Sequence, residues 1–66
     1  MFNPNQLRAE MARAGMTQKQ VANSIGISEN TFSKKMKDGS FGLEEAEKMI
    51  TLLDIQDPGA VFFARK

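Results

Sequence analysis

The 66-residue chain has no cysteine and no histidine. It therefore lacks the thiolate and imidazole groups that form most metal sites, and it has neither a cysteine nucleophile nor a histidine general base. It also has no glycine-rich phosphate loop, and its carboxylates are spread over one predicted helix face rather than gathered in a pocket. An enzyme is the least expected class, and we expect no metal and no cofactor.

Long apolar runs are missing as well. The longest, such as residues 60–64, contain only a few residues, so no segment can cross a bilayer, and the N-terminus lacks a signal-peptide pattern. We expect a cytoplasmic protein. Its length suits one small domain, residues 1–66, near the lower size at which a core is stable without disulfides or metal.

The charge is small overall but unevenly distributed. The net charge is +1, with +4 on residues 1–37, −5 on residues 38–64 and +2 on Arg65 and Lys66. Such polarity can orient a small protein toward phosphates, and ordinary solvated helix faces can produce it too.

Capping signals predict five helices. No run alternates apolar and polar residues in the way that a strand would, so no strand is predicted. Asn, Thr, Ser and Asp can accept a hydrogen bond from a free N–H of the first helical turn, and glycine readily ends a helix. Thr17 and Gln20 also have the spacing of a capping box. The predicted segments run from Asn3 to Gly15, Thr17 to Gly26, Ser28 to Gly39, Leu43 to Leu53 and Asp57 to Phe63.

Apolar residues recur at helical spacing within these segments, which predicts an all-α fold around one core. The residues expected to face inward are Leu7, Met11, Ala14, Val21, Ala22, Ile25, Ile27, Phe32, Met36, Leu43, Ala46, Met49, Ile50 and Leu53. Phe62 and Phe63 cannot both easily face one small core, so one of them is a candidate for a dimer interface.

Residues 17–37 meet the requirements of a helix-turn-helix. Ala22 is small where the two helices approach, Gly26 tolerates the positive φ of the turn, and Phe32 can anchor the second helix. The opposite face of that helix can then reach base edges in a DNA major groove. Its candidate base-reading residues are Glu29, Asn30, Ser33 and Lys34.

From about Leu7 to Ala64 the chain resembles the lambda-repressor-like family of phage repressors and Cro proteins. The resemblance rests on Gln18, Ala22, Gly26, Ser28, Phe32 and the ending LEEAEKMITLLDI. It implies a compact five-helix domain with the helix-turn-helix at its second and third helices. In that family, positions matching Glu29, Asn30 and Lys34 touch base edges.

Other polar side chains near the helix-turn-helix can contact DNA phosphates. The resemblance implies this role for Gln18. The full set of candidates is Thr17, Gln18, Ser28, Thr31, Lys35, Lys37 and Ser40. Structural alternatives exist, since Thr17 and Gln18 serve as caps in any case and Glu29 can simply stabilise a helix N-terminus. Ser40 is equally expected to be an ordinary loop residue.

Two features depart from the family pattern. Lys35 stands where many members have an apolar residue, and one extra residue precedes Gly39, which predicts a rotated or longer end of this helix. Met11 and Met36 stand where several phage repressors are expected to have a charged pair, so we expect an apolar contact there.

The resemblance implies a sequence-specific DNA-binding transcriptional regulator, in particular a phage or prophage Cro-like repressor that occupies a pseudo-palindromic operator. One domain reads few base pairs, so we expect a homodimer on double-stranded DNA, with its interface after the fourth helix, including residues 61–66. The alternative is a protein-interaction module, such as an antitoxin-like or anti-repressor domain.

Overall fold

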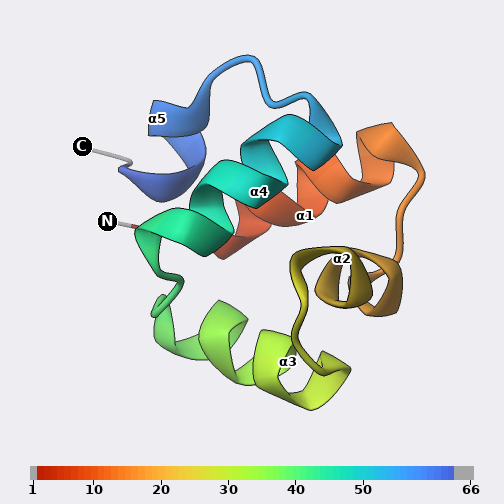
Figure 1. Cartoon of the computed structure of the whole chain (residues 1–66). Helices are drawn as coiled ribbons and strands as arrows, with labels where there is room; N and C mark the ends of the chain where they lie inside the picture. Colours follow the sequence, from red (N-terminus) through yellow and green to blue (C-terminus); the bar gives the residue numbers. More distant parts are fainter. Residues whose placement is uncertain (1, 64–66) are drawn as a thin grey trace.

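A computed structural model describes residues 2–63 as five α-helices. They are α1 (Pro4–Ala14), α2 (Gln18–Ile25), α3 (Glu29–Asp38), α4 (Leu43–Leu53) and α5 (Pro58–Phe62). α1 packs against α4 and α5, and α2 packs against both α3 and α4, so α3 lies at the edge of the bundle (Figure 1). Residues 2–63 contain no strand, which confirms the all-α, five-helix prediction. Within the same residues, no helix has the length and apolar character needed to span a membrane.

The predicted helix caps are confirmed at both ends. Four side chains accept a hydrogen bond from a first-turn N–H, and each such cap stabilises its helix by about 1 kcal/mol. These side chains belong to Asn3, Thr17, Ser28 and Asp57. The glycines that end helices with φ between 68° and 86° are Gly15, Gly26 and Gly39. Local hydrogen bonds therefore set most of the helix boundaries.

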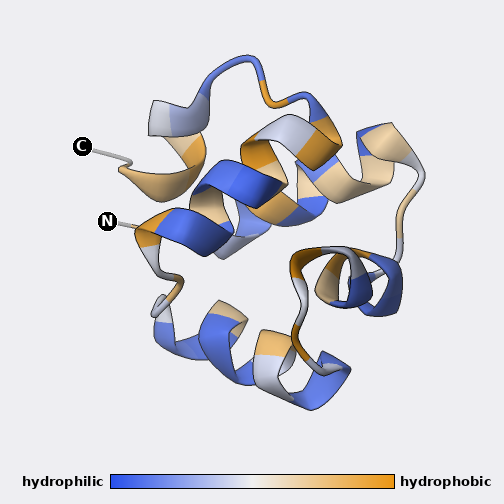
Figure 2. Ribbon diagram, in the orientation of Figure 1, coloured by the Kyte–Doolittle hydropathy of each residue, from blue (hydrophilic) through white to orange (hydrophobic). Residues whose placement is uncertain are grey.

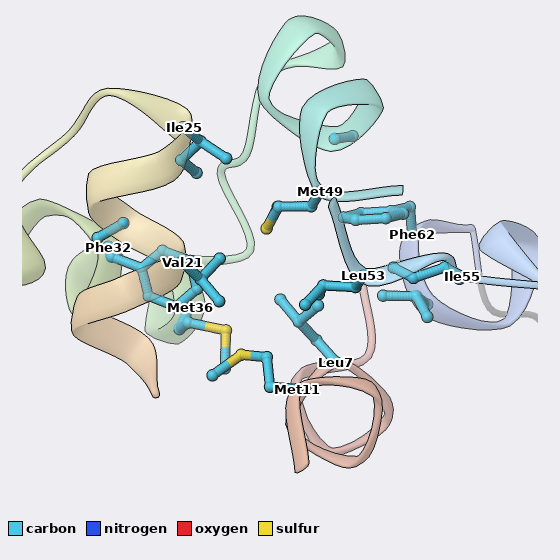
Figure 3. Close-up of a cluster of buried hydrophobic side chains, with 13 residues drawn as sticks. Leu7, Met11, Val21, Ile25, Phe32, Met36, Met49, Leu53, Ile55 and Phe62 are labelled. Carbon is cyan, nitrogen blue, oxygen red and sulfur yellow. The ribbon is translucent and has the colours of Figure 1, made fainter. Parts of the chain in front are cut away.

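The core is apolar, and every helix contributes to it. Within residues 2–63, no buried residue is polar or charged. Figure 3 shows Val21 and Phe32, from α2 and α3, on one side of the core and Leu53 and Met49 of α4 on the other. The hydropathy colouring shows the complementary pattern, with hydrophilic residues on the outer side of α3 (Figure 2).

Two residues predicted to face inward are exposed, so these predictions were wrong. Leu43 has 71% of its surface exposed, because it is the first residue of α4 and the buried stripe starts one turn later, at Ala46. Ala14 is the last residue of α1, and the chain turns at Gly15 so that Met16 packs against the core instead. Helical periodicity does not show which terminal residues of a helix extend beyond the core and are exposed.

The remaining apolar residues fill the periphery of the core. Ile27 and Ile50 are partly buried and pack against it, as predicted. Ile55 is a core residue that the periodicity misses, because it follows the end of α4 rather than belonging to a helical stripe. Phe62 is 8% exposed and Phe63 is 62% exposed, which confirms that only one of them faces the core.

Arg13 links α1 to the end of α4, a contact that the sequence did not reveal. Its Nη2 donates hydrogen bonds to the carbonyl oxygens of Leu53 at 2.6 Å and Asp54 at 3.1 Å, and it forms an ion pair with Glu10 at 2.7 Å. Asp54, the residue that caps the C-terminal end of α4, adopts the left-handed conformation with φ 51° although it is not glycine. The guanidinium thus satisfies free carbonyls and opposes the negative end of the helix dipole.

Arg13→Ala is expected to lower the free energy of unfolding by about 1 kcal/mol, because the carbonyls at the end of α4 lose a charged donor. Urea unfolding followed by circular dichroism measures the difference. Arg8→Ala is the matched control, since Arg8 is exposed and hydrogen-bonds to Asn5 in its own helix. Equal effects of the two substitutions would show that the link between α1 and α4 adds no stability.

Candidate nucleic-acid interface

α3 has an apolar face toward the core and a polar face toward solvent. Phe32 and Met36, four residues apart, are buried on the inner face. The exposed residues include all four that were predicted to read bases, namely Glu29, Asn30, Ser33 and Lys34. The structure therefore places these four on the side of α3 that is open to a ligand.

The turn from α2 to α3 is compact and hydrogen-bonded. Gly26 adopts φ 86°, and the Ile27 N–H donates to the Ala22 carbonyl oxygen at 3.0 Å. Ser28 then caps α3. Ala22 has no exposed surface, and its small side chain leaves room for the two helices to approach. This is the arrangement of a helix-turn-helix, with α3 as the outer helix.

Residues 6–61 match the model of a protein family described as the Cro/C1-type HTH DNA-binding domain. The chain belongs to this family. The matched residues include α2, α3 and α4 completely and most of α1 and α5. Neither a curated protein nor a solved structure matches the chain. The family assignment makes DNA the partner to consider for the exposed face of α3.

The start of α2 in this Cro/C1-type domain carries two of the predicted phosphate contacts. Thr17 is exposed, and its hydroxyl oxygen accepts from the Gln20 N–H at 3.2 Å, which leaves the hydroxyl proton available. Gln18 is half-buried in the first turn. First-turn N–H groups and the positive end of a helix dipole favour an anion at such a place. The phosphate roles of both residues remain predictions.

Four more predicted phosphate contacts lie at the two ends of α3. The Ser28 hydroxyl accepts from the Thr31 N–H at 3.1 Å and donates to the Thr31 hydroxyl at 2.9 Å. Lys37 is exposed in the last turn. The Ser40 N–H donates to the Lys35 carbonyl oxygen at 3.2 Å, so only its exposed hydroxyl is open to a ligand.

Lys35 differs from the exposed lysines of α3. Its Nζ lies 3.1 Å from Glu45 Oε1, and the two side chains are only 26% and 19% exposed. The pairing explains how a charged residue is accommodated at this half-buried position. α3 itself continues to Asp38 and ends at Gly39. A phosphate contact by Lys35 remains a prediction, and in this structure Glu45 already matches its charge.

Glu45 is the residue of this region whose role the sequence did not reveal. Its Oε1 also accepts from the Gly42 N–H at 2.9 Å. Burial raises the pKa of the Glu45 carboxyl, but the Gly42 hydrogen bond and the positive charges of Lys35 and Lys48 outweigh it, so the pKa is lowered. The spacing from Gly42 suits a helix cap, whereas no local signal connects Glu45 to Lys35, ten residues away.

Met11 and Met36 form the expected apolar contact between α1 and α3. They are 5% and 3% exposed, and Figure 3 shows their side chains directed toward each other. An apolar pair avoids the desolvation cost of burying two charges.

α4 has three acidic residues against one lysine, whereas α3 has three lysines against Glu29 and Asp38. Glu44 and Glu47 are exposed and line a shallow depression together with Ser24 of α2. No three acidic side chains among residues 2–63 are placed to hold a metal ion. These carboxylates would repel phosphate, so they favour an orientation in which α3 rather than α4 approaches DNA.

Gly26→Ala is expected to destabilise the domain by about 1 kcal/mol, because φ 86° is strained for an L side chain. The added Cβ would have no atom within 4 Å, so the effect isolates the backbone strain. Gly59→Ala in α5, where φ is not positive, is the control and is expected to be neutral or slightly stabilising. Thermal unfolding compares them, and a Gly26→Ala domain as stable as the parent would contradict the strain argument.

Proposed function

We propose that this chain is a sequence-specific transcriptional regulator that binds double-stranded DNA with α3 in the major groove. The division of α3 carries the proposal: Phe32 and Met36 fix it to the core, while Asn30 and Lys34 are exposed on its other face. A helix with side chains is about as wide as the major groove. Membership in the Cro/C1-type family supports the same use of this helix.

The exposed side chains of α3 match the groups that base edges present. Asn30 can make two hydrogen bonds to adenine, and Lys34 can donate to guanine O6 or N7. Glu29 can accept from the amino group of cytosine, and Ser33 can pair with several bases. Asn30 and Lys34 are four residues apart on one helix face, so they would address neighbouring base pairs.

Contacts to the DNA backbone would fix the position of α3 in the groove. The start of α2 and the two ends of α3 supply them on either side of the base-reading residues. The residues proposed for this role are Thr17, Gln18, Ser28, Thr31, Lys37 and Ser40. Lys35, the remaining predicted phosphate contact, is not among them because its charge is paired with Glu45.

Selection of bound duplexes from a random pool is expected to return a preferred sequence. Asn30→Ala should then reduce the preference for adenine at one position by roughly 5- to 100-fold, because one bidentate pair is lost. Lys37→Ala should weaken binding to all sequences alike and reduce the slope of log affinity against log salt by about one. Glu47→Ala, at an exposed position of α4, is the control and should preserve the preference.

Salt-independent binding that neither Asn30→Ala nor Lys37→Ala changes would contradict this proposal. It would favour the alternative of a protein-interaction module, such as an antitoxin-like or anti-repressor domain.

The more specific role that we propose is that of a phage or prophage Cro-like repressor. Such a protein acts in the cytoplasm of a bacterial host by occupying a pseudo-palindromic operator and blocking the polymerase. The family description, which names Cro together with C1, supports a regulator of this general type.

A second copy of the chain is the partner that we propose for an apolar groove at the end of α3. The groove has a volume of about 320 Å³ and includes Gly39, Leu43 and Phe63 in its lining. Leu43 and Phe63 are the large hydrophobic residues exposed in the described part of the chain. Of the segment predicted to dimerise, Val61 and Phe62 belong to the core and residues 64–66 lie outside the described residues. Phe63 therefore carries that prediction.

The dimensions of the domain support such a dimer. The domain measures 31 × 23 × 19 Å along its principal axes. Two copies side by side can therefore present their α3 helices about 34 Å apart, which is one turn of DNA. A contact at the end of α3 would leave the base-reading face of both copies free.

Leu43→Ser and Phe63→Ser are each expected to weaken binding to the full operator by about tenfold, because a dimer contact is lost. Affinity for an isolated half-site should not change, since neither residue lies on the base-reading face. Ala12→Ser, exposed on α1, is the control. Titrations of full and half operators measure the effect, and unchanged cooperativity in both variants would exclude this interface.

A further inference from the structure

One carboxylate oxygen connects the C-terminal part of α3 to the start of α4. Glu45 Oε1 accepts from Lys35 Nζ in α3 at 3.1 Å and from the Gly42 N–H at the start of α4 at 2.9 Å. A single atom thus connects α3, the loop that follows it and the first turn of α4.

The other attachments of this end of α3 are apolar, namely the buried Met36 and the contact of Phe2 with Gly39. α2 is the helix that packs most closely against α3, and the connection to α4 is a loop with glycine at both ends, Gly39 and Gly42. Phe41 in this loop packs against Phe32 in an edge-to-face arrangement, with ring centroids 5.2 Å apart. The ring contact holds the loop near α3, but an aromatic contact of this kind is tolerant of small rotations.

The position of Lys35 on α3 makes it sensitive to the rotation of the helix. Successive residues point about 100° apart around a helix axis, so Lys35 faces α4 while Lys34 is exposed. A rotation of α3 by about 20° would move a side-chain tip some 5–6 Å from the axis by about 2 Å. Such a shift exceeds the distance range of a good hydrogen bond to a base.

We propose that the Lys35–Glu45 ion pair sets the rotation of α3, so that Lys35 and Glu45 are positioning residues for base recognition and not phosphate contacts. The inference rests on the proposed DNA-binding function. Partial shielding of both side chains from water makes this pair more effective than an ordinary surface ion pair. The depressed pKa of Glu45 keeps the carboxylate charged at neutral pH.

The test uses Lys35→Met, Glu45→Gln and the double variant. Glutamine keeps an acceptor for the Gly42 N–H, so Glu45→Gln removes the charge without removing the cap. Each single variant is expected to reduce the ratio of operator to random-duplex affinity by about tenfold, with little change in affinity for random duplex. The double variant should be no worse than the poorer single variant, and Lys35→Arg should restore the ratio.

A matched control is available on α4. Lys48 also acts on the Glu45 carboxylate through its charge, but it belongs to the same helix and cannot hold α3. Lys48→Met should therefore leave the affinity ratio unchanged. All measurements are made at a temperature at which each variant is fully folded, so that a loss of stability alone does not alter the ratio.

Opposite effects of the two single variants would overturn the proposal. If Lys35→Met weakens all duplexes and lowers the salt slope by about one while Glu45→Gln strengthens them, Lys35 is a phosphate ligand that Glu45 restrains. Unchanged affinity ratios in both variants would overturn it as well.

Amide hydrogen exchange of the free domain separates this inference from the proposed function. Exchange in α3 should be faster in Lys35→Met and Glu45→Gln than in Lys48→Met, relative to exchange in α1. If the unmodified chain does not distinguish operator from random duplex, the proposed function fails, and this exchange decides the role of the ion pair alone. Equal α3 exchange in all three variants would overturn that role.

Discussion

The burial of Phe32 holds α3 to the domain, and the other features of the interface depend on it. Phe32 has no exposed surface, and its ring centroid lies 5.2 Å from that of Phe41. Because Phe32 and Met36 occupy one face of α3, Ser33 and Lys34 between them point to solvent. Lys35, also between them, turns to Glu45 instead. The apolar anchor therefore determines which side of α3 can meet DNA. Removing a buried phenylalanine costs about 3–5 kcal/mol, a large fraction of the stability of so small a domain.

Contacts between segments distant in sequence hold this small core together. The Asn3 N–H donates to the Val61 carbonyl oxygen at 2.7 Å, which ties the start of α1 to α5. Arg13 joins α1 to the end of α4. Both contacts satisfy backbone carbonyls near helix ends, where intrahelical partners are missing. Because the chain has no cysteine, the helices that support α2 and α3 are fixed to one another without any disulfide.

Some basic side chains form ion pairs within the domain, and others are exposed to solvent. Among residues 2–63, Arg13 and Lys35 form ion pairs with Glu10 and Glu45. Their charges serve the fold, and Lys34 and Lys37 on α3 remain exposed to an outside partner. The number of basic residues therefore overstates the positive charges that are free to bind phosphates. Of the other exposed basic residues, Arg8, Lys19 and Lys48 lie on α1, α2 and α4.

The sequence by itself determined the helices, their caps and the helix-turn-helix, because these depend on hydrogen bonds and side-chain spacings within about four residues. Gly26 and Phe32 were predictable for this reason, as was the exposed polar face of α3. Only the tertiary structure decided that Leu43 is exposed and that Ile55 is buried. It also decided the partner of Lys35. Burial at a helix end, and pairing across ten residues or more, depend on where the other helices lie, and no local pattern records that.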